Sequence, residues 1–347
     1  MDLTKIEASA ADQLLRINKL YSDKLKNISG IEIRVNWGFE SSFQATASEN
    51  LRIGGFDVTI SDGVFGKLNE MAVSCFEASC CQEIRTQFSL LPEYQELKQF
   101  PLIDDREVFI ERFYKITLLW IYFHELSHVL QDHKQISIEL GIIDEGWTKS
   151  IKPDVLTPHN TPHSPEGALR HIFEFSADSE ACVHTLNSLC ITNTAKQLLI
   201  PDVWFLAVGA TSLFYKFYKD SFVTASRSAS GTHPDSNLRL RLIVNQIDRM
   251  CELMHQNSST APWYKSREQT LRIIKSGMFR ALMPVVSDEQ NFDVAAYMDS
   301  IFEPSSCEDY GNYIFESFTK IKPKLLNNYK GIGTEGILVA SGPEAFC

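Results

Sequence analysis

One five-residue segment, His124-Glu125-Leu126-Ser127-His128, constrains this chain more than any other. It ends a largely apolar stretch whose apolar side chains recur at helical spacing, and the Asp104-Asp105 pair before that stretch can cap a helix. The spacing therefore predicts a buried helix that begins near residue 104 and carries both histidines on one side. The apolar positions of this stripe are Phe113, Ile116, Trp120 and Ile121, interrupted by polar Thr117.

Two histidines four residues apart on a helix lie on one face and can bind a single metal ion. Glu125 is one residue further along, so it projects to the side and can take a proton from a water on the metal without being a ligand. The alternative is a pair of core histidines that bind nothing. Burying two imidazoles and a carboxylate without a purpose is costly, which favours one zinc ion per chain on His124 and His128.

A catalytic zinc ion needs a third protein ligand and keeps its fourth position for water. His133 is the first candidate, but the arrangement H-E-x-x-H-x-x-G-x-x-H would place the third histidine at Lys134 and a glycine at position 131, so that spacing fails. Other carboxylates nearby are more typical of a solvated loop, and two further histidines in a proline-rich segment stay open as ligands. These residues are Glu139, Asp144, Glu145, His159 and His163.

Glu174 is the strongest candidate for the third ligand. Ser164-Pro165 is a strong helix start, and on that helix Glu174 and Asp178 are four residues apart and share a face. Glu174 can ligate the ion, while Asp178 can accept the free ring N–H of a ligand histidine. The alternative, an exposed acidic face, is disfavoured because Phe173 and Phe175 flank the glutamate with apolar surface.

Three motifs in this order resemble those of the gluzincin metallopeptidases, and within them the HtpX and CAAX-protease-like family. They are H-E-x-x-H, a downstream E-x-x-x-D helix, and Thr232-His233-Pro234 followed by Arg239 and Arg241, and together they span roughly residues 115–245. The resemblance implies zinc ligands His124, His128 and Glu174, with Glu125 as general base and Asp178 behind a ligand. It also implies that His233 and Arg239 belong to the rim of the site. There His233 could stabilise an oxyanion, although an ordinary loop histidine before a helix cap is an equal alternative.

The chain departs from that family because it has no stretch that could span a bilayer. Its two most apolar stretches, Ile116–Phe123 and Val203–Tyr215, are well short of the roughly twenty residues that a bilayer core requires. Intracellular relatives fit better. The chain is loosely similar to phage-exclusion peptidases of the Lit type, a likeness that implies a translation factor as substrate.

Charge and cysteine content limit the remaining classes of function. The formal net charge is −11 and no Lys/Arg cluster stands out, which argues against nucleic-acid binding. The N-terminus does not read as a secretory signal, and the eight cysteines are scattered, as is typical of reduced thiols in a cytoplasmic protein. We therefore expect a cytoplasmic protein without a membrane span. Its partner would be a protein or peptide substrate, and an activating partner stays open.

The remaining periodicity indicates a small sheet followed by helices. Helical spacing covers residues 2–27, 64–83, 165–190, 201–218 and 236–254, and strand-like alternation covers 31–35 and 56–60. The expected class is α+β, a mostly helical zincin-like metallopeptidase with a small N-terminal β-sheet. Its parts would be an α/β region (1–103), a helical catalytic core (104–285) and a helical C-terminal region with a tail (286–347), or all of these as one domain.

The predicted function is a zinc-dependent endopeptidase that cleaves an intracellular protein with a glutamate-activated water. An edge strand within residues 31–60 could bind an extended substrate by strand addition. The alternative is a non-hydrolytic zinc-containing sensor or binding protein of a bacterial defence or toxin-like system. Glu125 argues against it, because a pure binding site has no need for a general base.

Overall fold

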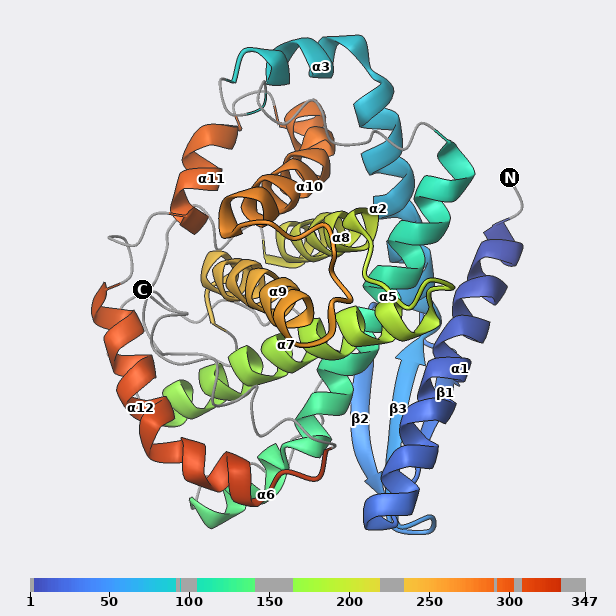
Figure 1. Cartoon of the computed structure of the whole chain (residues 1–347), viewed down its shortest axis with the longest axis vertical. Helices are drawn as coiled ribbons and strands as arrows, with labels where there is room; N and C mark the ends of the chain where they lie inside the picture. The colour runs from blue at the N-terminus through green and yellow to red at the C-terminus, as the bar shows by residue number, and fades with distance from the viewer. Residues whose placement is uncertain are drawn as a thin grey trace.

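The computed structural model describes residues 3–91, 94, 105–140, 165–218, 234–289, 292–302 and 308–331. Within them the chain is mostly helical with one small sheet near the N-terminus, which confirms the predicted α+β class. The sheet and α1 lie on one side of the molecule and α9 to α12 on the other (Figure 1). The helices are α1 (Leu3–Ser29), α2 (Asp62–Cys80), α3 (Gln82–Ser89), α5 (Arg106–Leu130), α6 (His133–Glu139), α7 (Pro165–Thr192), α8 (Ile200–Tyr218), α9 (Ser236–Ser258), α10 (Arg267–Asp288), α11 (Val294–Phe302) and α12 (Glu308–Asn327).

The three strands of the sheet are ordered β1 (Ile33–Gly38), β3 (Gly55–Ser61), β2 (Ala45–Asn50). The central strand β3 is parallel to β1 and antiparallel to β2, and Val58 pairs with both Val35 and Ala47. Both predicted strands are present, although β1 begins two residues later than expected. The hydropathy pattern does not predict β2, because its sequence, ATASEN, contains no large apolar residue.

The helices before the metal motif pack on the sheet and on one another. Helix α1 covers β1 with an apolar stripe that recurs every three to four residues, and α5 contacts β2 and β3. The helix predicted over residues 64–83 is two helices, α2 and α3. The break lies at Cys81, whose backbone is extended (φ −72°, ψ 121°). The α1 stripe consists of Ile6, Ala10, Leu14, Ile17 and Leu25.

Helix α5 is the centre of the fold and carries the metal motif in its last two turns. The side chain of Asp105 caps it by accepting a hydrogen bond from the Val108 N–H at 3.0 Å. Helices α1, α2, α7 and α8 and the sheet surround α5, so most of its side chains are buried. A helix that is apolar on all sides is typical of such a position.

The polar interruption at Thr117 has a structural reason. Its hydroxyl donates a hydrogen bond to the Phe113 carbonyl one turn earlier on α5, at 2.7 Å. Gly209 of α8 packs directly against this side chain, and a Cβ at Gly209 would lie 2.2 Å from the Thr117 Oγ1. The absence of a side chain at Gly209 is therefore what allows α8 to approach α5 so closely.

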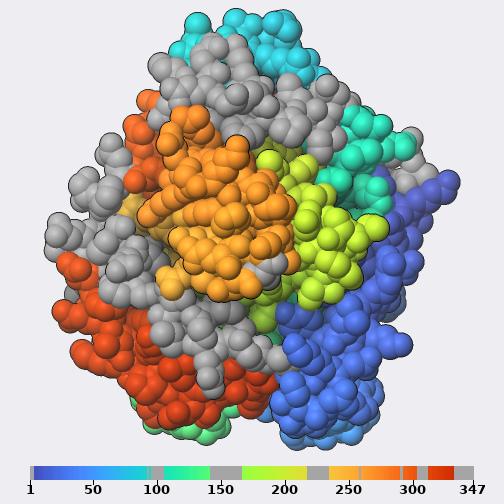
Figure 2. Space-filling view, viewed as in Figure 1, coloured from blue at the N-terminus to red at the C-terminus, as the bar shows by residue number. Residues whose placement is uncertain are grey.

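The main hydrophobic core crosses both expected domain boundaries. One cluster of buried apolar side chains extends from Ile6 to Ile301, so residues on either side of positions 103 and 285 share a core. A smaller cluster beside α7, α9 and α12 includes Phe173 and Leu238. The face shown in Figure 2 includes α1 (blue), the α9–α10 segment (orange) and α12 (red). None of the helices in the described part of the chain combines the length and apolarity needed to cross a membrane.

Candidate metal centre

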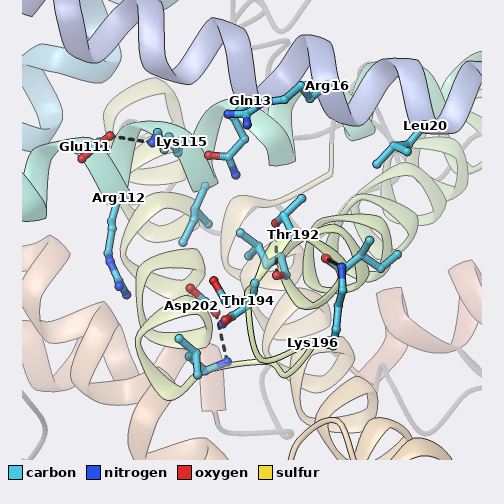
Figure 3. Close-up of a pocket in the computed structure, with 15 residues that line it drawn as sticks. Gln13, Arg16, Leu20, Glu111, Arg112, Lys115, Thr192, Thr194, Lys196 and Asp202 are labelled. Carbon is cyan, nitrogen blue, oxygen red and sulfur yellow. Dashed lines mark hydrogen bonds and ion pairs between the residues drawn. The ribbon is translucent and has the colours of Figure 1, made fainter.

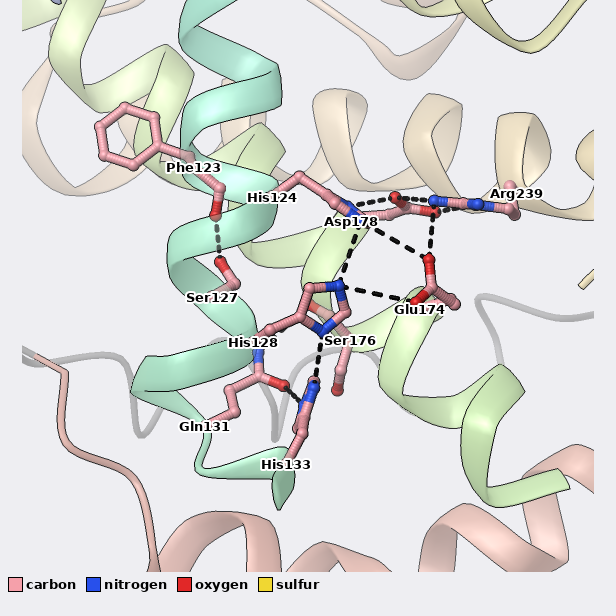
Figure 4. Close-up of polar contacts among 10 residues, drawn as sticks. All are labelled: Phe123, His124, Ser127, His128, Gln131, His133, Glu174, Ser176, Asp178 and Arg239. Atoms are coloured by element: carbon pink, nitrogen blue, oxygen red, sulfur yellow. Dashed lines mark hydrogen bonds and ion pairs between the residues drawn. The ribbon is translucent and has the colours of Figure 1, made fainter. Parts of the chain in front are cut away.

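Three predicted ligands meet between α5 and α7. The Nε2 atoms of His124 and His128 are 3.2 Å apart. Glu174 of α7 places Oε2 3.5 Å from the His124 Nε2 and Oε1 3.6 Å from the His128 Nε2 (Figure 4). All three side chains are buried, and together they form a group able to hold a metal ion.

The spacing of these donor atoms fits a small tetrahedral ion. Zinc binds nitrogen and oxygen ligands at roughly 2.0–2.1 Å, and at the tetrahedral angle two such ligands are separated by about 3.3–3.4 Å. The two imidazole nitrogens are 3.2 Å apart, and each faces a different oxygen of the Glu174 carboxylate, at 3.5 and 3.6 Å. One donor atom from each of the three residues lies within 4.8 Å of the other two, so the group is compact enough to hold such an ion.

The local sequence explains how the two helices come so close. The histidines are one turn apart near the C-terminal end of α5, and Glu174 is in the first half of α7. Ala177 and Ala181 of α7 are completely buried, and α5 and α7 pack together over much of their length. Small side chains at this crossing allow the carboxylate of one helix to reach the imidazoles of the other.

Asp178 and Arg239 lie behind the three candidate ligands, and Arg239 is buried rather than at the rim where the motif resemblance puts it. The Asp178 Oδ1 is 2.9 Å from the His124 Nδ1, so it can accept the ring N–H opposite the metal position. Arg239 of α9 donates two hydrogen bonds to Asp178, at 2.7 and 2.8 Å, and lies 3.3 Å from the Glu174 Oε2. A bidentate guanidinium–carboxylate pair fixes the carboxylate in orientation as well as in charge. Arg241, in contrast, donates to the Ile301 carbonyl at 2.6 Å.

The site has a strongly negative electrostatic character. Burial by itself lowers the pKa of His124, but hydrogen bonds and charge from Asp178 and Glu174 outweigh it and raise that pKa to about 9. Arg239 is the cation that the described residues place against these two carboxylates. Since a buried carboxylate is costly without a compensating charge, the centre attracts a further positive charge, whether a proton or a metal ion.

His133 is buried beside the centre but is not one of its ligands. Asp132, at the end of α5, has a left-handed backbone (φ 52°) that turns the chain so that His133 folds back toward α5. The His133 Nδ1 lies 2.8 Å from the Nδ1 of His128, on the side of that ring away from Glu174. The ring also stacks on Phe173, with 4.1 Å between centroids. His133 lies outside the group formed by His124, His128 and Glu174, and the H-x-x-G-x-x-H spacing does not reveal its contact with His128.

The structure also locates the other candidates. Glu125 is buried on α5, one residue after His124. Glu139 is exposed on α6 and forms an ion pair with Lys324 at 3.1 Å, so it is not a ligand. Five predicted candidates lie outside the described residues. They are Asp144, Glu145, His159, His163 and His233.

A cavity of about 710 Å³ lies elsewhere, between α1, the first half of α5 and the α7–α8 connection (Figure 3). Its charged lining is mixed. Lys115 pairs with Glu111 at 2.6 Å, and the Lys196 ammonium donates to the Ile191 carbonyl at 2.6 Å. Asp202 accepts a hydrogen bond from the Leu199 N–H at 3.1 Å. Most of these charged groups form ion pairs or hydrogen bonds within the wall of the cavity, and none belongs to the metal centre.

Comparisons of the chain with protein-family models, with curated proteins and with solved structures find no match. The chemistry of the site therefore rests on its own residues.

Proposed function

We propose that this chain is a zinc-dependent metalloendopeptidase with the ligand arrangement of the gluzincins, that its fold is zincin-like, and that it acts on an intracellular protein in the cytoplasm. The observation that carries the proposal is the triangle formed by His124, His128 and Glu174, with donor separations of 3.2–3.6 Å. Zinc suits this triangle because two imidazoles and one carboxylate are its usual ligands in hydrolases. Structural zinc sites are closed by four protein ligands, whereas three leave a position for chemistry.

When bound, zinc supplies a Lewis acid that acidifies water and polarises a carbonyl group. The protein's own groups then have separate tasks. Glu125 accepts the proton of the attacking water and passes it to the leaving amine, as expected of a general base beside a metal ligand. Asp178 places a carboxylate oxygen 2.9 Å from the His124 Nδ1, where it favours the proton on that atom and leaves Nε2 for the metal. Arg239 holds Asp178 and offsets its charge.

An extended substrate has an edge strand available in β2. This strand is the edge of the sheet away from α1, and it packs against α5, which carries the metal ligands (Figure 1). We expect Ser48→Ala/Glu49→Ala, which trims exposed side chains of β2, to weaken cleavage while zinc content is unchanged. Arg34→Ala on the opposite edge, β1, is the matched control. Unaltered cleavage by the β2 variant would argue against strand addition there.

One observation favours a second candidate, a non-hydrolytic zinc sensor or binding protein. The side chains of His124, His128 and Glu174 are at most 7% exposed, whereas a peptidase has to admit a polypeptide. A closed site of this kind would hold zinc for stability or signalling. Glu125 separates the candidates, because only hydrolysis requires it.

The deciding experiment compares the natural chain with Glu125→Gln. Metal analysis of both purified proteins should find about one zinc ion per chain, since Glu125 is not a ligand. Proteomic comparison of cells expressing either form should then reveal cleaved proteins only with the natural chain, because a missing general base typically costs 10²–10⁴-fold in rate. Equal cleavage by both forms would refute the mechanism, and zinc without any cleavage would support the sensor.

A further inference from the structure

A series of buried hydrogen bonds extends from His128, the second proposed metal ligand. The His128 Nδ1 contacts the His133 Nδ1 at 2.8 Å, and the His133 Nε2 contacts the Gln131 Oε1 at 2.6 Å. The Gln131 Nε2 in turn donates to Glu180 Oε2 at 2.8 Å and to the Ser176 carbonyl at 3.3 Å. Figure 4 shows His128, His133 and Gln131 in sequence, with the imidazole of His128 between Glu174 and His133.

The last two acceptors, Glu180 and the Ser176 carbonyl, determine which atom donates in every hydrogen bond of this series. A carboxylate and a backbone carbonyl only accept hydrogen bonds, so the amide nitrogen of Gln131 has to face Glu180 and Ser176. The Gln131 oxygen is then left to accept, which requires the His133 proton on Nε2. A neutral His133 consequently offers Nδ1 as an acceptor, and His128 has to donate through Nδ1–H. The lone pair of His128 is thereby placed on Nε2, the atom that faces Glu174.

We infer that Gln131 and Glu180 are positioning residues that hold His133 and His128 in the tautomers needed for metal binding. The inference rests on the proposed zinc centre and extends it. The Nδ1 of His124 faces the acceptor Asp178 directly. The Nδ1 of His128 is connected to its acceptor, Glu180, through His133 and Gln131. Helix α7 supplies the final acceptors of both routes together with the third ligand, so the orientation of the centre is set largely from one helix.

The burial of these residues strengthens their control of the histidine tautomers. Gln131, His133 and Glu180 are at most 1% exposed, so solvent does not compete for these hydrogen bonds. The far oxygen of Glu180 faces the His184 Nε2 at 3.9 Å, and the His184 Nδ1 hydrogen-bonds to the hydroxyl of Tyr21 on α1. An amide flip of Gln131 would place its oxygen against the Glu180 carboxylate. Both oxygens only accept, so no hydrogen bond would form between them.

The test reads the tautomers directly in the full-length protein. Long-range proton–nitrogen correlation spectra, with isotope label at the histidine nitrogens and assignment by replacing one histidine at a time, report which ring nitrogen carries each proton. We expect the His133 proton on Nε2 in both the metal-free and the zinc-loaded protein. Gln131→Met, which fills the same space without directional hydrogen bonds, should give mixed His133 tautomers and a zinc affinity lower by about 10–100-fold.

Gln135→Met is the matched control, because Gln135 is an exposed glutamine of the same segment and should change neither quantity. Glu180→Gln is the second variant should Gln131→Met fail to fold; it removes one of the two acceptor-only partners and keeps the Ser176 carbonyl, so it should mix the tautomers less than Gln131→Met does. A wild-type His133 proton on Nδ1, or Gln131→Met with wild-type tautomers and zinc affinity, would overturn the inference. A natural chain that binds no zinc but keeps the His133 proton on Nε2 would refute the proposed function and leave the hydrogen-bond direction standing.

Discussion

Replacing Glu174 by alanine removes the ligand that α7 contributes to the centre, and the structure gives the size of the expected loss. Zinc sites of four protein ligands are worth roughly 10–16 kcal/mol, or about 2.5–4 kcal/mol per ligand. Because each Glu174 oxygen faces one of the two imidazole nitrogens, at 3.5 and 3.6 Å, Glu174 should contribute a full ligand's share. The zinc dissociation constant of Glu174→Ala should therefore rise by roughly 10²–10³-fold.

Asp178, the residue behind His124, should matter less for zinc affinity than Glu174 does. Asp178→Asn keeps the shape of the side chain but weakens the acceptor for the His124 Nδ1–H, so a smaller loss of about 10–100-fold is expected. Affinity is measured at fixed pH by competition with a chromogenic chelator, and stoichiometry by elemental analysis. Far-ultraviolet circular dichroism of the metal-free variants checks that each still folds.

Glu166→Ala is the control for this series, because Glu166 is an exposed carboxylate on the same helix, paired with Arg170 at 2.8 Å. It should bind zinc as the natural chain does. Equal zinc binding by Glu174→Ala and Glu166→Ala, or a greater loss in Asp178→Asn than in Glu174→Ala, would refute the role of Glu174 as a ligand.

Three further predictions concern stability. Gly209→Ala should destabilise the fold by about 1–3 kcal/mol, because its Cβ would lie 2.2 Å from the Thr117 Oγ1, and Thr117→Ala in the same chain should recover part of the loss in urea unfolding. Burial, with a smaller effect of nearby Lys24, lowers the pKa of His184 from 6.5 to about 4, so the metal-free protein should lose up to about 3 kcal/mol as pH falls from 6.5 to 4. His184→Gln should flatten that dependence, and an equally steep profile would contradict it. Asp105→Ala should lower the thermal midpoint by removing a cap worth about 1 kcal/mol; an unchanged midpoint would show that the cap is dispensable.

The sequence predicted the helices well because their signals are local. The cap at Asp105, the stripe from Phe113 to Ile121 and the Ser164-Pro165 start all act within one or two turns, and α5 and α7 lie where those signals place them. Strand β2 was missed since its stability comes from pairing with β3, a partner with which it shares no hydropathy pattern. The alternation of Ile31–Val35 located β1, but pairing with Phe56–Ser61 decided where it begins.

In the site, too, contacts that depend on local spacing could be predicted, and contacts that depend on tertiary packing could not. His124, His128, Glu174 and Asp178 could be assigned from spacing, because four residues on a helix correspond to one face and one turn. The contact between His133 and His128 could not, since it depends on the left-handed backbone of Asp132 at the end of α5. Glu180 carries no sequence signal at all. Its meeting with Gln131 is a product of the way α7 crosses α5.

The enclosure of α5 has a consequence for how such a protein can change. A helix that is surrounded on every side has almost no position where a substitution affects metal binding alone, because each side chain also fills part of the common core. Helix α7 is enclosed in the same way from residue 171 to residue 186, the part that carries Glu174 and Asp178. Descendants with a different metal preference, or with none, would therefore be expected to keep most residues of both helices long after the chemistry has gone.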